Sequence, residues 1–288
     1  MSLLPRHVLE AAYLEACECE LRAFKPGNVS VHSQGHDMTV DDFRRSAEVS
    51  VSHLCDEGLS LGEKIFRAIR ATRNAVGCNT NLGIVLLAAP LIQACQTGSG
   101  GEPLRENLRR VLHSTTLQDA DLVYRAIRLA APGGLGESPE QDIHAAPEVT
   151  LLDAMRIGSG RDRIAFQYVS CYADVFDLAI PSYHTALCRW GAKEWATVAV
   201  FVGLLKRIPD SHVERKFGPR FTMMVTDRMT MLERTLSASA KPEQVIPLLQ
   251  DVDDEFKSAG INPGTTADLT VTCLLAASLD RLLTGRKH

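Results

Sequence analysis

The chain has 288 residues, of which 45% are hydrophobic and 23% charged, so it can bury a large core and is not disordered as a whole. Its 31 Lys and Arg nearly balance 35 Asp and Glu, and the net charge of −4 excludes a nucleic-acid binder that works through a global basic field. The longest uncharged stretch, Asn74 to Gly101, has an apolar core only from Ile84 to Ile92. A membrane span needs about 20 apolar residues, so we expect no contact with a membrane.

In chain order, the apolar residues repeat mainly with helical spacing. Ile65, Ile69, Thr72 and Val76 follow one helical face, and similar stripes occur over residues 104–112 and 225–236. Residues 195–205 are apolar on nearly every side, which predicts a central buried helix. We therefore predict an all-α fold, a single compact multi-helix bundle with little or no β-sheet, and one domain over residues 1–288. The irregular stretch 132–148 is either a lid or a surface loop.

The eight cysteines lie mostly inside apolar runs, and no two form a Cys-x-x-Cys pair. We expect reduced, mainly buried thiols in a cytoplasmic protein, with no structural zinc. No segment at the start resembles a secretory signal, because no basic region leads into an apolar one.

The first polar segment that helix packing does not require runs from Glu20 to Asn28. A helix with two carboxylates ends there at Lys25-Pro26-Gly27-Asn28. Pro26 forces Lys25 out of helical geometry, and Gly27 can adopt a positive φ that lets the backbone approach a ligand. The simpler interpretation is a helix end with an exposed lysine.

A second segment contains His36 and Asp37, just before a predicted helix start. Thr39 and Asp42 have the spacing of a capping box, so Thr39 should begin the helix. Asp37 is then a candidate ligand for Mg²⁺, and His36 a candidate for phosphate contact or proton transfer. Alternatively, Asp37 only completes the cap.

The third and fourth segments also lie at predicted helix starts. Asn79, Thr80 and Asn81 precede a very apolar helix, and three polar residues exceed what one cap requires, so they are candidates to bind a ribose or a base. Thr265 and Asp268 have the spacing of another capping box. Asp268 is also a candidate metal ligand.

Two further clusters carry positive charge that could clamp phosphates. Arg161 and Arg163 follow a Gly-Ser-Gly turn, and Arg215 and Lys216 follow Asp210. Either cluster could equally be a solvated surface. The sequence has neither a P-loop nor a Rossmann glycine motif, so a nucleotide would bind without them.

Six motifs in order give this chain its resemblance to a known family: KPGN, GHDM, GCNTNLG, RDRIA, DSHVERKFG and NPGTTADL. Together they resemble the triphosphoribosyl-dephospho-coenzyme A synthase family over most of the chain. That family is all-helical and acts in making the prosthetic group of citrate lyase and malonate decarboxylase. The resemblance implies ATP and 3′-dephospho-coenzyme A as substrates, release of adenine, and transfer of a triphosphoribosyl group to the ribose 2′-hydroxyl.

The chain departs from the family pattern at three of these motifs. Residues 79–83 read Asn-Thr-Asn-Leu-Gly where Asn-Thr-His-Lys-Gly is expected, and residues 263–268 read Pro-Gly-Thr-Thr-Ala-Asp in place of Pro-Gly-Gly-Ser-Ala-Asp. Asn28 stands where leucine is usual. The chain therefore looks like a divergent branch, whose acceptor can differ.

The resemblance and the chemistry together assign expected roles. Mg²⁺ is the expected cofactor, and its candidate ligands are Asp37, Asp210 and Asp268. Glu20, His36 or Asp37 is expected to carry out the proton transfer of the reaction. The candidate substrate and phosphate ligands are Lys25, Asn28, Asn79, Thr80, Asn81, Arg161, Arg163, Arg215, Lys216, Thr265 and Thr266.

Two other functions fit the same residues. One is a Mg²⁺-dependent hydrolase of nucleotide N-glycosides, which would release free ribose 5-triphosphate. The other is a nucleotide-binding relative without catalysis, which would bind ATP but release no adenine. A homodimer is compatible with the transferase, with the hydrolase and with the nucleotide-binding relative.

Overall fold

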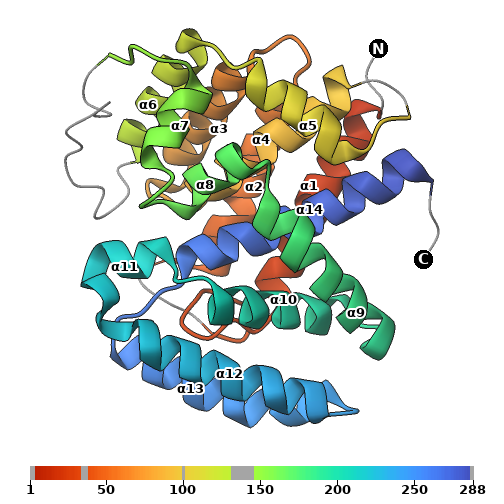
Figure 1. Ribbon diagram of the computed structural model, residues 1–288, viewed down its shortest axis with the longest axis vertical. Helices are drawn as coiled ribbons and strands as arrows, with labels where there is room; N and C mark the ends of the chain where they lie inside the picture. The colour runs from red at the N-terminus through yellow and green to blue at the C-terminus, as the bar shows by residue number, and fades with distance from the viewer. Residues whose placement is uncertain (1–3, 34–37, 99–100, 131–145, 286–288) are drawn as a thin grey trace.

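The protein is built almost entirely from α-helices, as the sequence predicts (Figure 1). The computed structural model describes residues 4–33, 38–98, 101–130 and 146–285. Within these ranges there is no β-strand, and an isolated bridge joins Ser30 and Ser33. His36, Asp37 and most of the irregular stretch 132–148 lie outside the described residues, so their predicted roles stay predictions.

The α-helices follow one another with short connections, apart from the segment between α6 and α7. In chain order they are α1 (Arg6–Arg22), α2 (Val40–Leu54), α3 (Leu61–Val76), α4 (Leu82–Thr97), α5 (Leu104–His113), α6 (Leu117–Ala130), α7 (Leu151–Gly158), α8 (Arg163–Ser170), α9 (Ile180–Trp190), α10 (Lys193–Arg207), α11 (Ser211–Phe217), α12 (Thr222–Ala238), α13 (Ile246–Ser258) and α14 (Gly264–Thr284). A π-helical turn, Asp174–Ala179, leads into α9. Two 3₁₀ turns, Gly218–Phe221 and Pro242–Val245, precede α12 and α13.

Two hydrophobic clusters fill the interior. The larger is formed by α1–α9 with most of α14, and the smaller lies between α10, α12 and α13. Helix α10 has a face in each: Val200 and Leu204 belong to the larger cluster, and Phe201 and Leu205 to the smaller. This confirms the predicted buried helix over residues 195–205. Helix α14 crosses the middle of the molecule in Figure 1, between the upper group of helices and α10.

Local sequence signals explain several helix starts. The Thr39 side chain accepts a hydrogen bond from the Asp42 backbone N–H, and the Asp42 carboxylate accepts one from Thr39, which confirms the predicted capping box of α2. Ser60 caps α3 in the same way, and Asp162 caps α8. These caps depend on neighbours in the chain and are readable without the fold.

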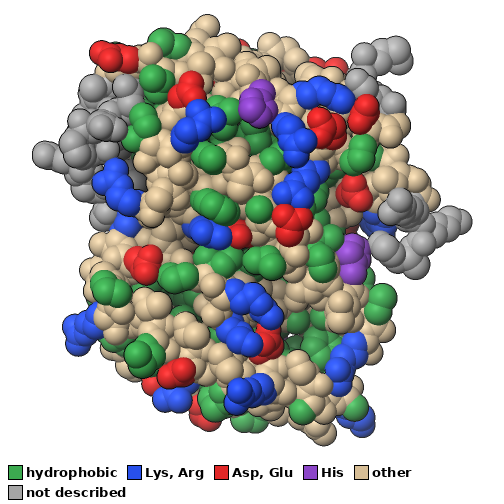
Figure 2. Space-filling view, viewed as in Figure 1, with side chains coloured by type: hydrophobic (Ala, Val, Ile, Leu, Met, Phe, Trp, Pro, Cys, Tyr) green, Lys and Arg blue, Asp and Glu red, His purple; other side chains and the backbone are tan. Residues whose placement is uncertain are grey.

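The charged side chains at the surface and the state of the cysteines match what the sequence predicts. Figure 2 shows positive and negative side chains interspersed over one face of the molecule. All eight cysteines are free, and six are buried. Among the helices that the structure describes, none is long and apolar enough to cross a membrane.

Candidate functional site

Motifs far apart in the sequence meet around the amino-terminal end of α14. The turn after α1 is joined to the turn before α14 by a hydrogen bond of 2.8 Å from Asn28 Nδ2 to Asn262 Oδ1. The Ser211 hydroxyl at the start of α11 accepts a hydrogen bond from the Arg163 backbone N–H (3.1 Å) and donates one to Thr265 Oγ1 (3.2 Å). The starts of α8, α11 and α14 and the end of α1 therefore form one region, which is the candidate site.

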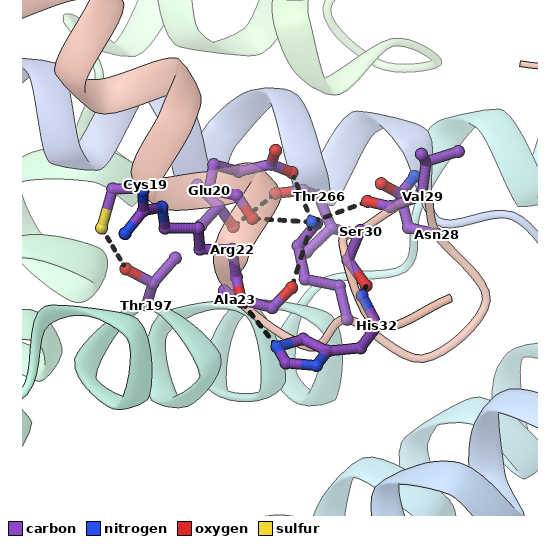
Figure 3. A network of polar contacts seen from close by, with 12 residues as sticks. Cys19, Glu20, Arg22, Ala23, Asn28, Val29, Ser30, His32, Thr197 and Thr266 are labelled. Atoms are coloured by element: carbon purple, nitrogen blue, oxygen red, sulfur yellow. Dashed lines mark hydrogen bonds and ion pairs between the residues drawn. The ribbon is translucent and has the colours of Figure 1, made fainter. Parts of the chain in front are cut away.

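Lys25 is completely buried at the end of α1. Its surroundings include Glu20, Ala23 and Val29, which Figure 3 labels. Its Nζ donates hydrogen bonds to the backbone oxygens of Glu20 (2.8 Å), Val29 (2.9 Å) and Ala23 (3.3 Å), and it lies 3.2 Å from the Glu20 carboxylate. Burial lowers the pKa of Lys25, although Glu20 opposes the shift. An ammonium group has three protons to donate, and these acceptors use them all. In this structure Lys25 therefore caps the carbonyl end of α1 and holds Glu20, and its predicted contact with the triphosphate stays a prediction.

The turn itself needs its glycine. Gly27 has a φ of +80°, which confirms the predicted positive φ, and a side chain there would lie 2.8 Å from the Ile261 carbonyl oxygen. The Gly27 N–H donates to the Asp253 carboxylate at 2.7 Å. Asp253 also contacts Ser33 and Lys257, so α13 fixes this turn from the other side. Asn28 is buried, and its amide nitrogen donates a hydrogen bond to Asn262, so this nitrogen is used within the protein.

Asp210 joins the starts of two helices. Its Oδ1 accepts hydrogen bonds from the backbone N–H groups of His212 (2.9 Å) and Val213 (3.1 Å), which caps α11. Its Oδ2 accepts from the Thr266 N–H (2.7 Å) and hydroxyl (2.8 Å) in the first turn of α14. Both oxygens thus accept hydrogen bonds from donors within the protein, which gives Asp210 and Thr266 a structural role. The predicted metal role of Asp210 and ligand role of Thr266 stay predictions.

Asp268 has a different environment from the predicted capping box. Helix α14 begins at Gly264 without a side-chain cap, because Asp210 serves its first turn, so the prediction that Thr265 and Asp268 form a box is wrong. Within the described part of the chain, the Asp268 carboxylate has no hydrogen-bond or ion-pair partner. Burial raises its pKa well above the usual range, and the nearby carboxylates of Asp210, Glu20 and Asp162 raise it further, while Arg215 opposes them.

The start of α4 lies against Asp268. A side chain on Gly83 would come within 2.0 Å of Asp268 Oδ2, so the glycine makes room for the carboxylate. Asn79 Oδ1 accepts the Leu82 N–H at 3.2 Å and supplies the cap. Thr80 is buried and bonds to Ser46. Asn81 is also buried, and its Oδ1 has no hydrogen-bond partner.

The four predicted basic residues differ in their availability. Arg163 binds Asp174 with two hydrogen bonds of 2.6 and 2.7 Å, so its guanidinium is used within the protein. Arg215 Nη1 donates to Asp162 at 2.6 Å, whereas its buried Nε has no partner. Arg161 and Lys216 are exposed, and Lys216 reaches the Gly260 carbonyl at 3.3 Å.

Sequence reasoning assigned no role to Asp162, Gly83 or Ser46, which the structure places at the site. Asp162 lies inside the RDRIA motif and Gly83 inside the GCNTNLG motif, and this position was the signal that could have marked them as site residues. No three His, Cys, Asp or Glu side chains within the described ranges form a group that could hold a metal by themselves.

Comparison with known proteins agrees with this arrangement of motifs. The chain is similar in fold to a crystal structure from Archaeoglobus fulgidus assigned as a triphosphoribosyl-dephospho-coA synthase, with a TM-score of 0.62 and 22% identity. The similarity covers 81% of this chain and 96% of the other. A search of curated proteins gave no match. The family model for ATP:dephospho-CoA triphosphoribosyl transferase, CitG, matches residues 6–287. Because that match spans nearly the whole sequence, the chain belongs to the CitG family.

Proposed function

We propose that this protein transfers the 5-triphosphoribosyl group of ATP to the ribose 2′-hydroxyl of 3′-dephospho-coenzyme A, or of a related acceptor, and releases adenine. Family membership supports the transferase class and the two substrates. The observation that carries the proposal is the Asp268 carboxylate, which has no hydrogen-bond or ion-pair partner among the described residues and lies where several motifs meet. The departures at residues 79–83 and 263–268 leave room for a related acceptor.

The charges at the site favour a divalent cation. Burial is the main cause of the raised pKa of Asp268, and the nearby carboxylates of Asp210, Glu20 and Asp162 raise it further, while Arg215 opposes them. A cation beside Asp268 would offset this concentration of negative charge. Mg²⁺ prefers oxygen ligands and is usually held by one or two carboxylates together with phosphate oxygens and water. Asp268 fits this pattern, with Asp37 as the proposed second ligand. The cation would neutralise part of the triphosphate charge.

Other side chains at the site suit the departing base and the phosphates of the substrate. Breaking the N-glycosidic bond develops positive charge at C1′ and negative charge on the departing base, so the base needs a proton or a strong hydrogen bond. We assign this task to Glu20 or His36. The buried Nε of Arg215 has no hydrogen-bond partner in the part of the chain that the structure describes and is our candidate donor to a phosphate oxygen. The exposed Arg161 and Lys216 add positive charge.

The free cysteines support a cytoplasmic location, because a reducing compartment keeps thiols unpaired. We therefore propose that the reaction takes place in the cytoplasm.

Incubation of the pure protein with ATP, Mg²⁺ and 3′-dephospho-coenzyme A, followed by mass spectrometry, tests the proposal. We expect adenine and a heavier acceptor in equal amounts, and no reaction after chelation of the metal. Free ribose 5-triphosphate without a new acceptor would show a hydrolase. ATP binding without adenine release would show a relative that has lost catalysis.

A further inference from the structure

An ion pair joins the starts of α8 and α11 at the candidate site. Asp162 comes directly before α8, and its Oδ1 accepts a hydrogen bond of 3.0 Å from the Ala165 N–H, which caps the helix. Its Oδ2 accepts a hydrogen bond of 2.6 Å from Nη1 of Arg215 on α11. The two oxygens of this carboxylate therefore serve different donors, one in the backbone and one in a side chain.

The contact with Asp162 uses only one nitrogen of the Arg215 guanidinium. A carboxylate often binds arginine through two parallel hydrogen bonds, as Asp174 does with Nε and Nη2 of Arg163 at 2.6 and 2.7 Å. Asp162 cannot do so while one of its oxygens caps α8. Arg215 is left with an Nε–Nη2 edge that has no hydrogen-bond partner among the described residues.

This unpaired edge indicates a ligand that supplies oxygen atoms. The Nε of Arg215 is buried, and a buried donor is normally satisfied. The side chain as a whole is 20% exposed, so part of it is accessible to a ligand. A guanidinium edge with two N–H groups matches the spacing of two oxygens on a phosphate.

The direction of this edge depends on Asp162. Helix α11 has seven residues, too few for an isolated helix to be stable. Arginine is one of the side chains with the most rotamers, so an unrestrained Arg215 would lose its orientation. Within the described ranges Asp162 is its single hydrogen-bond partner. The ion pair is therefore the contact that selects one orientation of the guanidinium.

The pair lies beside the proposed reaction centre. Ser211, in the same short helix as Arg215, donates a hydrogen bond to Thr265 in the first turn of α14. Besides burial, which is the main cause of the raised pKa of Asp268, Asp162 raises that pKa and Arg215 lowers it, so both charges act on this carboxylate. Phosphates held by a cation at Asp268 would thus come close to Arg215.

We propose that Asp162 is a positioning residue, which holds Arg215 by Nη1 and thereby presents the Nε–Nη2 edge of the guanidinium to the triphosphate of ATP. This inference rests on the proposed function. Asp162 itself touches no substrate. The triphosphate is transferred intact, so its contact with Arg215 is the same before and during the reaction. Loss of such a contact weakens ATP binding and leaves the rate of the bound complex nearly unchanged.

Asp162→Ser separates positioning from capping. Serine caps a helix about as well as aspartate, so α8 should keep its start, whereas the hydroxyl lacks the second oxygen that holds Arg215. We expect the KM for ATP to rise about tenfold, the effect of losing one hydrogen bond to a charged group. The kcat should stay within about twofold of the wild type, and the KM for the acceptor should not change.

A double variant shows whether Asp162 acts through Arg215. Arg215→Met removes the phosphate contact itself and should raise the KM for ATP by about 10–100-fold. Addition of Asp162→Ser to Arg215→Met should raise it no further, because the group that Asp162 positions is already gone. An ion pair that only ties α8 to α11 would lower the melting temperature and leave the KM for ATP as it was.

Two more variants complete the test. Asp177→Ser is the matched control, because it removes an ion pair with Arg105 (2.6 and 3.0 Å) outside the candidate site, and it should keep the wild-type kinetics. Asp162→Asn replaces Asp162→Ser if circular dichroism shows that the serine variant does not fold. Asparagine also caps helices, and with its oxygen on the Ala165 N–H its amide nitrogen would face Arg215 Nη1, so two donors would meet.

The outcomes separate this inference from the proposed function. With adenine still released, an unchanged KM for ATP in folded Asp162→Ser or in Arg215→Met, or a further rise in the double variant, would overturn the positioning role and leave the transferase intact. If no acceptor supports adenine release, the transferase fails, and calorimetry with inorganic triphosphate and Mg²⁺ tests Asp162 alone. Binding about tenfold weaker in Asp162→Ser than in the wild type supports the role. Absent or equal binding overturns it.

Discussion

Gly83→Ala tests whether the position of the Asp268 carboxylate matters. The added Cβ would lie 2.0 Å from Asp268 Oδ2 and 2.5 Å from its Cγ. Ordinary contacts begin near 3.4 Å, so the carboxylate must move by about 1.4 Å. Rotation of the Asp268 side chain can move Oδ2 and Cγ away, whereas the contact with its Cβ at 3.2 Å requires a shift of a few tenths of an ångström between the two helices.

The expected result is a loss of activity without a loss of fold. Misplacement of a reacting group by about 1 Å can cost on the order of 100-fold in rate, and we expect a loss of this size in adenine release. Alanine favours a helix over glycine by up to about 1 kcal/mol, so the thermal midpoint should stay near that of the wild type. Adenine release followed by chromatography, together with circular dichroism melting, measures both.

Gly158→Ala is the control for the substitution itself. Its Cβ would meet Ala165 Cβ at 3.5 Å, an ordinary contact at the end of α7. This variant should keep wild-type activity. A folded Gly83→Ala protein with the wild-type rate would refute the reasoning, because the chemistry would then not depend on where Asp268 lies.

Three further predictions concern charged groups at the site. Asp268→Asn removes a group proposed to hold the charge-stabilising cation and should lower adenine release by about 10²–10³-fold. Because the fold raises the pKa of Asp268, the wild type loses stability as the pH rises from the ordinary aspartate range through the pKa of the folded state. The variant cannot titrate at this position, so its melting temperature relative to that of the wild type should rise over the same pH interval. A difference in melting temperature that stays constant with pH would contradict this. Lys25→Met leaves the carbonyl oxygens of Glu20, Ala23 and Val29 without their shared donor and should cost about 1–3 kcal/mol in urea unfolding. A cost below about 0.5 kcal/mol would show that these oxygens find other donors. Asp210→Ala removes the caps of α11 and α14 and should cost about 1–4 kcal/mol, twice the usual value for one cap; amide hydrogen exchange should accelerate in the first turns of both helices, and acceleration in α11 alone would show that Thr266 finds another acceptor.

The sequence was a good guide where structure depends on close neighbours. The capping box of Thr39 and Asp42 is confirmed because both partners lie within one helical turn. The same spacing at Thr265 and Asp268 misled, because Asp210, more than fifty residues earlier, already satisfies the first turn of α14. The same Thr-x-x-Asp spacing therefore gave two different structures, because at the second position the fold supplies Asp210 as the partner of the helix start.

Burial was the main quantity that the sequence could not provide at the site. Lys25 follows a helix and precedes a proline, which is typical of an exposed turn, and it is buried because the chain folds back and brings the Val29 carbonyl to its Nζ. The contacts that bring the end of α1 and the starts of α8, α11 and α14 together join residues tens to hundreds of positions apart, so no local spacing could show them. The free Oδ1 of Asn81 required knowledge of the Ser46 carbonyl from α2, which no spacing within residues 77–83 contains.

Helix α10 supplies side chains to both hydrophobic clusters on alternating faces, with Val200 and Leu204 on one and Phe201 and Leu205 on the other. Loss of this helix would strip apolar surface from both clusters at once. Each cluster therefore raises the cost of opening the other, and the upper and lower groups of helices should melt together in one cooperative transition. An insertion or cut placed in α10 would therefore disable the whole molecule, including the candidate site around the start of α14.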